Sequence, residues 1–182
     1  MVKPIREIFR NWAVLDADGR HVNGTDKESN HRYGDTYETL FQDRDTVYMV
    51  MEVGVADGAC LCAWREVFLN ALIVGMDIHP AANWNGEFHL GDQRSQQDCE
   101  WAAAGRFFDL IVEDAVHSVE NSLLTLFWLW PYIKPGGLYV IEEFANIGAV
   151  SDNVLALLPN VKVLRTVGPS GGVEPLVVLR KV

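Results

Sequence analysis

The sequence has few cysteines, no long apolar run and no excess of positive charge. Cys60, Cys62 and Cys99 are an odd number without the spacing of a metal site, which favours reduced thiols in a cytoplasmic protein. Because 15 lysines and arginines stand against 25 aspartates and glutamates, the formal charge of −10 argues against a nucleic acid or an anionic membrane as a partner. Residues 1–12 contain no apolar h-region of the kind a secretory leader has, and no apolar run approaches the roughly 18 residues that a membrane span needs. We therefore expect a cytoplasmic globular protein, folded as one domain.

A nucleotide-binding pattern occupies residues 47–80. Two apolar runs, residues 47–53 and 72–76, flank a turn with two glycines and a helical stretch, and the second run ends on an acid. Strand, glycine turn, helix, strand and acid together make a nucleotide cradle, because glycines let the backbone approach the ligand and the helix N-terminus offers free N–H groups. In such a cradle the acid, here Asp77, accepts hydrogen bonds from both ribose hydroxyls.

The spacing of the glycines distinguishes between the cofactors that share this geometry. The dinucleotide fingerprint G-x-G-x-x-G is absent, and the turn reads Glu52-Val-Gly54-Val-Ala-Asp-Gly58. This E-x-G-x-x-x-G pattern resembles motif I of class I S-adenosylmethionine-dependent methyltransferases, in which no pyrophosphate has to be seated. The resemblance implies that S-adenosylmethionine is bound by the residues of this turn and of the following strand end, namely Glu52, Gly54, Gly58, Asp77 and Ile78.

Strands alternate with helices along the rest of the chain. The expected strands are residues 47–53, 72–76, 88–90, 107–112, 138–141, 161–167 and 175–179. Their alternation with helices predicts an α/β fold with a doubly wound, mostly parallel Rossmann-like sheet. Residues 168–172 indicate a hairpin that makes the last strand antiparallel, which resembles the seven-stranded methyltransferase sheet of order 3-2-1-4-5-7-6. Residues 1–45, with one short amphipathic helix and no clear strand, are expected to cover a core of residues 46–182.

Polar side chains follow most of the predicted strands. Besides Asp77 they are Asp92, Gln93, Glu113, Asp114, His117, Glu142 and Glu143. Ligands of open α/β sheets bind beyond the carboxyl ends of the strands, so these groups should converge on one crevice, where a cation would offset the repulsion of the carboxylates. Asp92 and Gln93 are expected on the adenine side of the cofactor, although Asp92 and Asp114 could instead cap the helices that follow them.

Asp114, Glu142 and Glu143 make a hard oxygen-ligand set that suits Mg²⁺. The two glutamates are consecutive and begin on opposite faces of a strand, so both reach one ion only if the strand end is irregular. His117, three residues after Asp114, is a candidate general base or a structural histidine. As a base beside metal-bound Asp114, it would take the proton of an acceptor hydroxyl, and the oxygen would attack the methyl group in line with the departing sulfur.

Motifs between Gly24 and Glu143 resemble a known family, the metal-dependent sugar O-methyltransferases of macrolide biosynthesis of the mycinamicin and macrocin type. The matching segments are GTDK (24–27) with His31, Tyr33 and Tyr37, EVGVADGACLCAWREVF (52–68), GMDI (75–78), FDLIVEDAVHS (108–118) and KPGGLYVIEEF (134–144). The resemblance implies Mg²⁺ on Asp114, Glu142 and Glu143, with His117 as the base. It also implies that Thr25 and Lys27 lie over the cofactor, and that the acceptor is a sugar or another small polyhydroxylated natural product.

Departures from the family pattern keep other hypotheses open. The family's D-D-G-S-H is Glu113-Asp114-Ala115-Val116-His117 here, and its E-D is Glu142-Glu143. We also expect the protein to lack the large N-terminal domain of the macrolide enzymes. Alternatives are a nitrogen acceptor, a reaction without metal, or a protein that binds S-adenosylmethionine or S-adenosylhomocysteine without transfer activity. A dehydrogenase ranks last, because the G-x-G core is missing. Trp12, Trp84 and Trp101 could pack in the core, cover the pocket or form the interface of a homo-oligomer.

Overall fold

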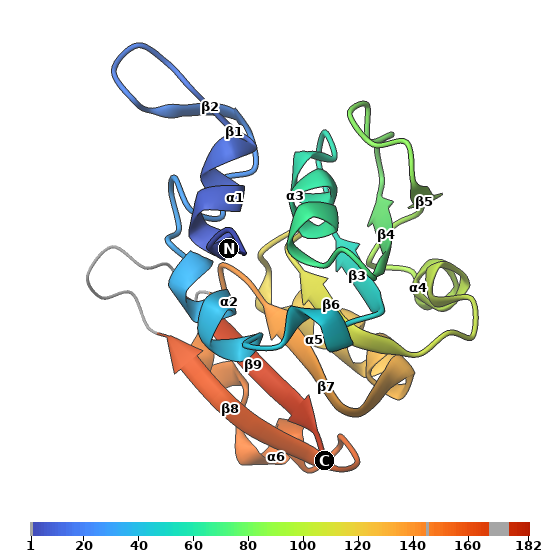
Figure 1. Ribbon diagram of the computed structural model, residues 1–182. Coiled ribbons are helices and arrows are strands. Elements are labelled where there is room, and N and C mark those ends of the chain that lie inside the picture. Colours follow the sequence, from blue (N-terminus) through green and yellow to red (C-terminus); the bar gives the residue numbers. More distant parts are fainter. Residues whose placement is uncertain (1, 145, 168–174) are drawn as a thin grey trace.

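The computed structural model describes residues 2–144, 146–167 and 175–182, and its centre is a seven-stranded sheet (Figure 1). The strands are β3 (Met49–Val53), β4 (Leu72–Asp77), β5 (Glu87–Leu90), β6 (Phe108–Glu113), β7 (Ile133–Ile141), β8 (Val161–Val167) and β9 (Leu176–Lys181). Their order across the sheet is β5-β4-β3-β6-β7-β9-β8. The first five are parallel, and β9 runs antiparallel to both β7 and β8. The predicted fold class and strand order are confirmed.

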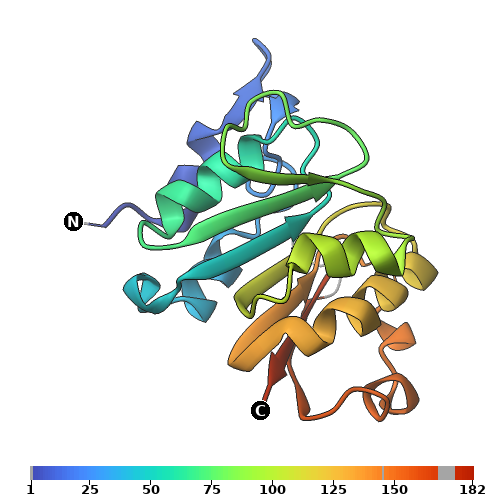
Figure 2. The same ribbon diagram turned by 90° about the vertical axis from the view of Figure 1, so that its right-hand side faces the viewer.

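Helices cover both faces of the sheet, as its apolar strands require. Their bounds are α1 (Ile5–Asn11), α2 (Gly34–Leu40), α3 (Ala59–Val67), α4 (Gln96–Ala103), α5 (Val119–Leu129) and α6 (Asp152–Leu155). Helices α1, α2 and α3 pack on one face, and α4 and α5 pack on the other (Figure 2). In β3, Val50 packs into the first cluster and Met51 into the second, because successive side chains of a strand point to opposite faces. Burial on both sides explains why the parallel strands are nearly continuous apolar runs.

The first 45 residues contain a two-stranded antiparallel hairpin, so the expectation of no strand in this part of the chain is wrong. Strands β1 (Ala13–Leu15) and β2 (His21–Gly24) form this hairpin, which projects away from the main sheet in Figure 1. Asp16 stabilises the turn, since its Oδ1 accepts from the backbone N–H groups of Asp18 and Arg20. The strands are short and mostly exposed, and therefore lack the apolar alternation by which a strand is recognised.

Smaller differences concern the ends of elements. Strand β7 begins at Ile133, five residues before the strand expected at residues 138–141. Helix α5 ends at Leu129 and is followed by a 3-10 turn, Trp130–Tyr132. Two other 3-10 turns are Arg44–Thr46 and Ile147–Ala149. The predicted hairpin connection at residues 168–172 lies outside the described residues.

Two further observations concern the cysteines and the length of the helices. Cys60, Cys62 and Cys99 are buried and free. Among the described residues, no helix combines the length and the apolar character that crossing a bilayer requires.

Candidate functional site

A cavity of ≈ 560 Å³ lies beyond the carboxyl ends of β3, β4, β6 and β7. Its walls come from β2 and the residues after it, the turn after β3, and the loops that follow β4, β5, β6 and β7. The predicted site residues that line it are Thr25, Gly54, Asp77, Ile78, Asp92, Gln93, Asp114, His117 and Glu143. The predicted site residues that do not line it are Lys27, Glu52, Gly58 and Glu142. The strand ends therefore converge on one cavity, as expected. Four of the predicted site residues are buried behind its wall.

The turn after β3 is shaped by two glycines with different surroundings. Gly54 has φ +83°, and a Cβ there would lie 2.3 Å from the carbonyl oxygen of Asp114. Gly58, at φ +91°, precedes α3, and its Cβ would lie 2.9 Å from the Cβ of Trp84. Gly54 thus allows two strand-end loops to meet beside the cavity, whereas Gly58 allows α3 to pack against residues 81–84.

Asp77 holds the glycine turn in place from the end of β4. Its Oδ2 accepts from the backbone N–H groups of Val55 (2.8 Å) and Ala56 (3.0 Å). Its Oδ1 accepts from the N–H of His79 at 2.9 Å. Ala56 has φ +47°, an unfavourable conformation for a residue with a side chain, which these bonds help to stabilise. Asp77 lines the cavity, as the nucleotide pattern requires, and its contact with ribose stays a prediction.

The acids that follow β5 and β6 do not cap the helices that come after them. Asp92 forms an ion pair with Arg94 at 2.7 Å. The residues that cap α4 and α5 are Ser95 and Ser118, whose hydroxyls accept from backbone N–H groups one turn on. The alternative that Asp92 and Asp114 cap these helices is therefore wrong.

Lys27 is buried at the centre of a cluster of carboxylates behind the cavity wall. Its Nζ lies 2.8 Å from Glu52, 2.9 Å from Asp114 and 2.5 Å from Glu142. Burial acts to lower the pKa of Lys27, but the charges of Asp114, Glu142 and Glu52 raise this pKa well above its usual value. Lys27 therefore stays charged and offsets part of the negative charge.

Each of the two glutamates in this cluster accepts a hydrogen bond from a neutral aromatic side chain. Tyr37 donates its hydroxyl to Glu142 at 2.5 Å, and Trp64 donates its indole N–H to Glu52 at 2.9 Å. Burial raises the pKa of both Glu52 and Glu142. Trp64 was not predicted as a site residue, because a tryptophan in an amphipathic helix gives no signal that its N–H serves a carboxylate.

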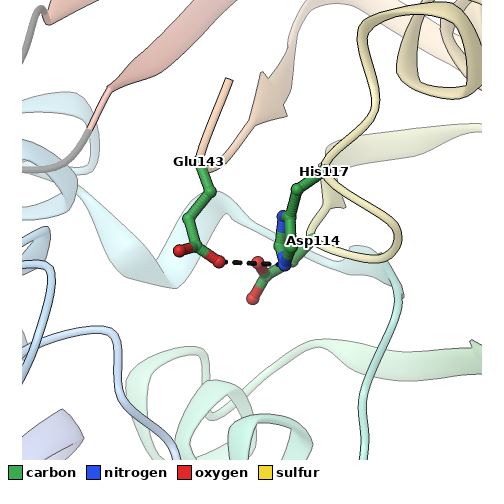
Figure 3. Close-up of side chains that lie close together, drawn as sticks. All are labelled: Asp114, His117 and Glu143. Carbon is green, nitrogen blue, oxygen red and sulfur yellow. Dashed lines mark ion pairs between the residues drawn. The ribbon is translucent and has the colours of Figure 1, made fainter. Parts of the chain in front are cut away.

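Asp114, His117 and Glu143 lie together at the cavity (Figure 3). One potential ligand atom from each lies within 4.8 Å of the others. His117 Nε2 is 2.9 Å from Glu143 Oε2, and this contact raises the pKa of His117 and lowers the pKa of Glu143. Both residues have positive φ values, +53° and +50°, which cost energy and often mark functional sites.

The predicted magnesium ligands divide between these two clusters. Asp114 and Glu143 lie side by side at the cavity, whereas the Glu142 carboxylate is bonded to Lys27 and Tyr37. The third potential metal ligand at the cavity, beside Asp114 and Glu143, is His117. Both glutamates follow Ile141, the last residue of β7, and Glu143 has φ +50°, so the backbone turns away from the strand between the two carboxylates. A full set of Asp114, Glu142 and Glu143 on one ion stays a prediction.

Two residues at this site were not predicted as site residues. His31 Nε2 lies 3.0 Å from Asp26 and 3.7 Å from the second oxygen of Glu143. Asp26 lines the cavity. The only signal for either residue is its place in the GTDK segment and the residues after it.

A mostly parallel sheet of this order, with a glycine turn after its first strand and an acid at the end of its second, is the fold of Rossmann-like methyltransferases. No model of a protein family matches the chain. Among solved structures, the mycinamycin-pathway methyltransferase MycE in complex with Mg and SAH has a TM-score of 0.76 at 20% identity, covering 100% of this chain and 55% of that one. The amino pentose methyltransferase CalS10 of Micromonospora echinaspora has a TM-score of 0.61 at 15% identity, covering 81% of this chain and 89% of that one.

Curated relatives confirm the resemblance to sugar O-methyltransferases. The chain is 30% identical over 126 residues to a demethylmacrocin O-methyltransferase of Streptomyces fradiae, covering 62% of the chain and 32% of that enzyme. It is 30% identical over 148 residues to an 8-demethyl-8-alpha-L-rhamnosyl tetracenomycin-C 2'-O-methyltransferase of Streptomyces olivaceus, covering 70% of the chain and 39% of that enzyme. The chain thus spans between 32% and 39% of the length of these two relatives.

Proposed function

We propose that this protein is an S-adenosylmethionine-dependent O-methyltransferase that acts, with Mg²⁺, on a sugar or another small polyhydroxylated natural product. One observation carries the proposal: a single cavity joins the glycine turn and Asp77 to the cluster of Asp114, His117 and Glu143. A nucleoside-binding turn thereby adjoins the groups that could activate a hydroxyl. By their names the curated relatives are O-methyltransferases, and the Streptomyces olivaceus enzyme acts on a rhamnosyl tetracenomycin; MycE was solved with Mg and SAH.

The cavity fits the proposed cofactor. Its volume of ≈ 560 Å³ falls within the range of about 300–1,000 Å³ for small-molecule sites. Gly54 lets the loop after β6 meet the turn after β3 beside the cavity, and Asp77 is placed to accept from ribose hydroxyls. On this proposal Ile78, Asp92 and Gln93 lie toward the adenine, and Thr25 covers the cofactor. Lys27, Glu52 and Gly58 act from behind the wall, by fixing the residues that line it.

The donor set also fits a hard divalent cation. Asp114 and Glu143 each offer a carboxylate oxygen, the two within 4.8 Å of one another, and oxygen is the ligand that Mg²⁺ prefers. Glu142 would join them only by exchanging its bond with Lys27 for the ion. When bound, S-adenosylmethionine supplies an electrophilic methyl group, and Mg²⁺ lowers the pKa of an acceptor hydroxyl.

His117 would remove the proton of the acceptor hydroxyl. Its Nε2 lies 2.9 Å from Glu143, so the carboxylate stabilises the imidazolium that results. General bases contribute roughly 10²–10⁴-fold to a rate. On this proposal residues 1–45 form the cover segment, because β2 and residues 25–26 already make one wall of the cavity.

Formation of S-adenosylhomocysteine from S-adenosylmethionine, measured with a panel of glycosylated acceptors, tests the proposal. Turnover should need Mg²⁺, stop with EDTA, and fall roughly 10²–10⁴-fold in His117→Asn. His89→Asn is the matched control, because His89 lies outside the cavity wall. Cofactor binding without turnover on any acceptor would favour the binding-protein alternative, and turnover that EDTA leaves unchanged would refute the metal-assisted reaction.

A further inference from the structure

Gln93 connects three parts of the protein through its side-chain amide. Its Nε2 donates to Glu113 at the end of β6 (2.8 Å) and to the hydroxyl of Thr125 in α5 (3.1 Å). Its Oε1 accepts from the backbone N–H of Val116 at 2.8 Å. Only 3% of Gln93 is exposed, although it lines the cavity.

These contacts leave Gln93 little capacity to bind a ligand. A glutamine amide has two N–H donors and one carbonyl oxygen, and here both donors and one lone pair of the oxygen are used inside the protein. A hydrogen bond from Nε2 to adenine would have to displace Glu113 or Thr125, both of which are buried. Removing a partner from such a buried group is costly. The direct adenine contact expected from the sequence is therefore the less favourable use of this side chain.

The loop that Gln93 holds needs external support. It runs from Asp114 to His117, contains Ala115 and Val116 but no glycine, and ends on His117 with φ +53°. One end is fixed by the bond from the Asp114 N–H to the Val53 carbonyl (2.8 Å). The other end is fixed by the bond from the Val116 N–H to Gln93, one residue before His117. Without the bond from Val116 to Gln93, the backbone next to His117 would lose a hydrogen bond that helps to hold His117 in its unfavourable conformation.

We propose that Gln93 is a positioning residue: it holds the loop after β6 so that His117 meets Glu143 and Asp114 at the cavity. Glu113 and Thr125 orient the amide of Gln93, and the amide in turn fixes Val116. The consequence for catalysis rests on the proposed function, whereas the consequence for the loop does not depend on it.

The test uses Gln93→Met, which keeps the length of the side chain and removes all three hydrogen bonds. Hydrogen exchange at the Val116 amide should rise at least tenfold, because its acceptor is lost. The kcat for methyl transfer should fall roughly 10–100-fold, since small displacements of reacting groups cost rates of this order. The Kd for S-adenosylhomocysteine should change less than about threefold, which separates positioning from cofactor contact.

Two further variants keep the result interpretable. Gln97→Met makes the same substitution at an exposed position on α4 and should leave all three measurements unchanged. Thr125→Val, which is isosteric, removes one partner of the amide but leaves the bond to Val116. It should give a smaller increase in hydrogen exchange at the Val116 amide than Gln93→Met does. If Gln93→Met does not fold, this increase in Thr125→Val tests whether Gln93 holds the loop.

The outcomes distinguish this inference from the proposed function. If Gln93→Met binds S-adenosylhomocysteine at least tenfold more weakly than the wild-type protein, while hydrogen exchange at the Val116 amide is unchanged, Gln93 is not a positioning residue. That result would support the adenine contact instead. Unchanged exchange together with unchanged kcat would overturn the positioning role as well. If the wild-type protein binds no S-adenosylhomocysteine, the proposed function fails, while the Val116 amide still reports whether Gln93 holds the loop.

Discussion

Gly54 lies where the turn after β3 meets the loop after β6, and the two backbones are nearly in contact there. A Cβ on Gly54 would lie 2.3 Å from the Asp114 carbonyl oxygen and 2.4 Å from the Ala115 Cα. These are backbone atoms of the loop that carries Asp114 and His117, so they cannot move aside without moving the site. Gly136 has a similar φ, +85° against +83°, but no atom lies within 4 Å of its Cβ position.

Alanine substitution at these two glycines therefore separates backbone strain from crowding. Gly136→Ala should lower the free energy of unfolding by about 1–2 kcal/mol, the cost of a positive φ in a residue with a side chain. Gly54→Ala should lower it by about 1–3 kcal/mol more, because of the overpacking, and should also abolish binding of S-adenosylhomocysteine. Urea unfolding and calorimetric titration measure the two effects. Equal losses in the two variants, with binding intact, would show that the contact between the loops is not needed.

At the scale of elements, Lys27 ties the N-terminal segment to three strand ends. Glu52 lies in β3, and Asp114 and Glu142 directly follow β6 and β7. The same segment places Thr25 and Asp26 in the cavity wall. The bonds of Lys27 thus connect the carboxyl ends of these three strands to the N-terminal segment that forms part of the cavity wall.

Lys27→Met should be strongly destabilising, because it leaves buried carboxylates without their cation. Removing one partner of a buried ion pair costs about 3–5 kcal/mol. Lys134→Met is the matched control: Lys134 pairs with Asp109 at 2.9 Å in a half-exposed position, where such a pair contributes about 0–1 kcal/mol. Chemical denaturation of both variants checks the difference. Similar, small losses would mean that the carboxylates around Lys27 are neutral in the folded protein.

The main elements could be predicted from the sequence because each has a local cause. Strands β3, β4 and β6 are apolar runs buried on both faces, and the glycine turn marks the start of α3. The convergence of Asp77, Asp114 and Glu143 followed from the rule that parallel strands end at one edge.

Other features depend on contacts between residues far apart in the sequence. The hairpin of β1 and β2 is exposed and lacks an alternating pattern. The partners of Gln93 lie 20 or more residues away, so its orientation could not be inferred from its neighbours. Whether Glu142 faces the cavity depends on Lys27, 115 residues away in the chain.

For the whole molecule, charge and topology point to the same kind of ligand. The net charge is −10, and carboxylates gather where the parallel strands end. A site of this kind attracts cations and repels polyanions. The sulfonium of S-adenosylmethionine and a divalent metal ion are cations of suitable size, and both belong to the proposed reaction.

Calorimetric titration with S-adenosylmethionine and S-adenosylhomocysteine, with Mg²⁺ and with EDTA, measures whether the cavity binds the proposed cofactor. We expect micromolar binding by the wild-type protein, loss of binding in Asp77→Ala, and no change in Asp35→Ala, an exposed aspartate outside the cavity wall. Absence of heat with either ligand at high protein concentration would contradict the account, and the glycine turn would then serve another nucleotide or the fold alone.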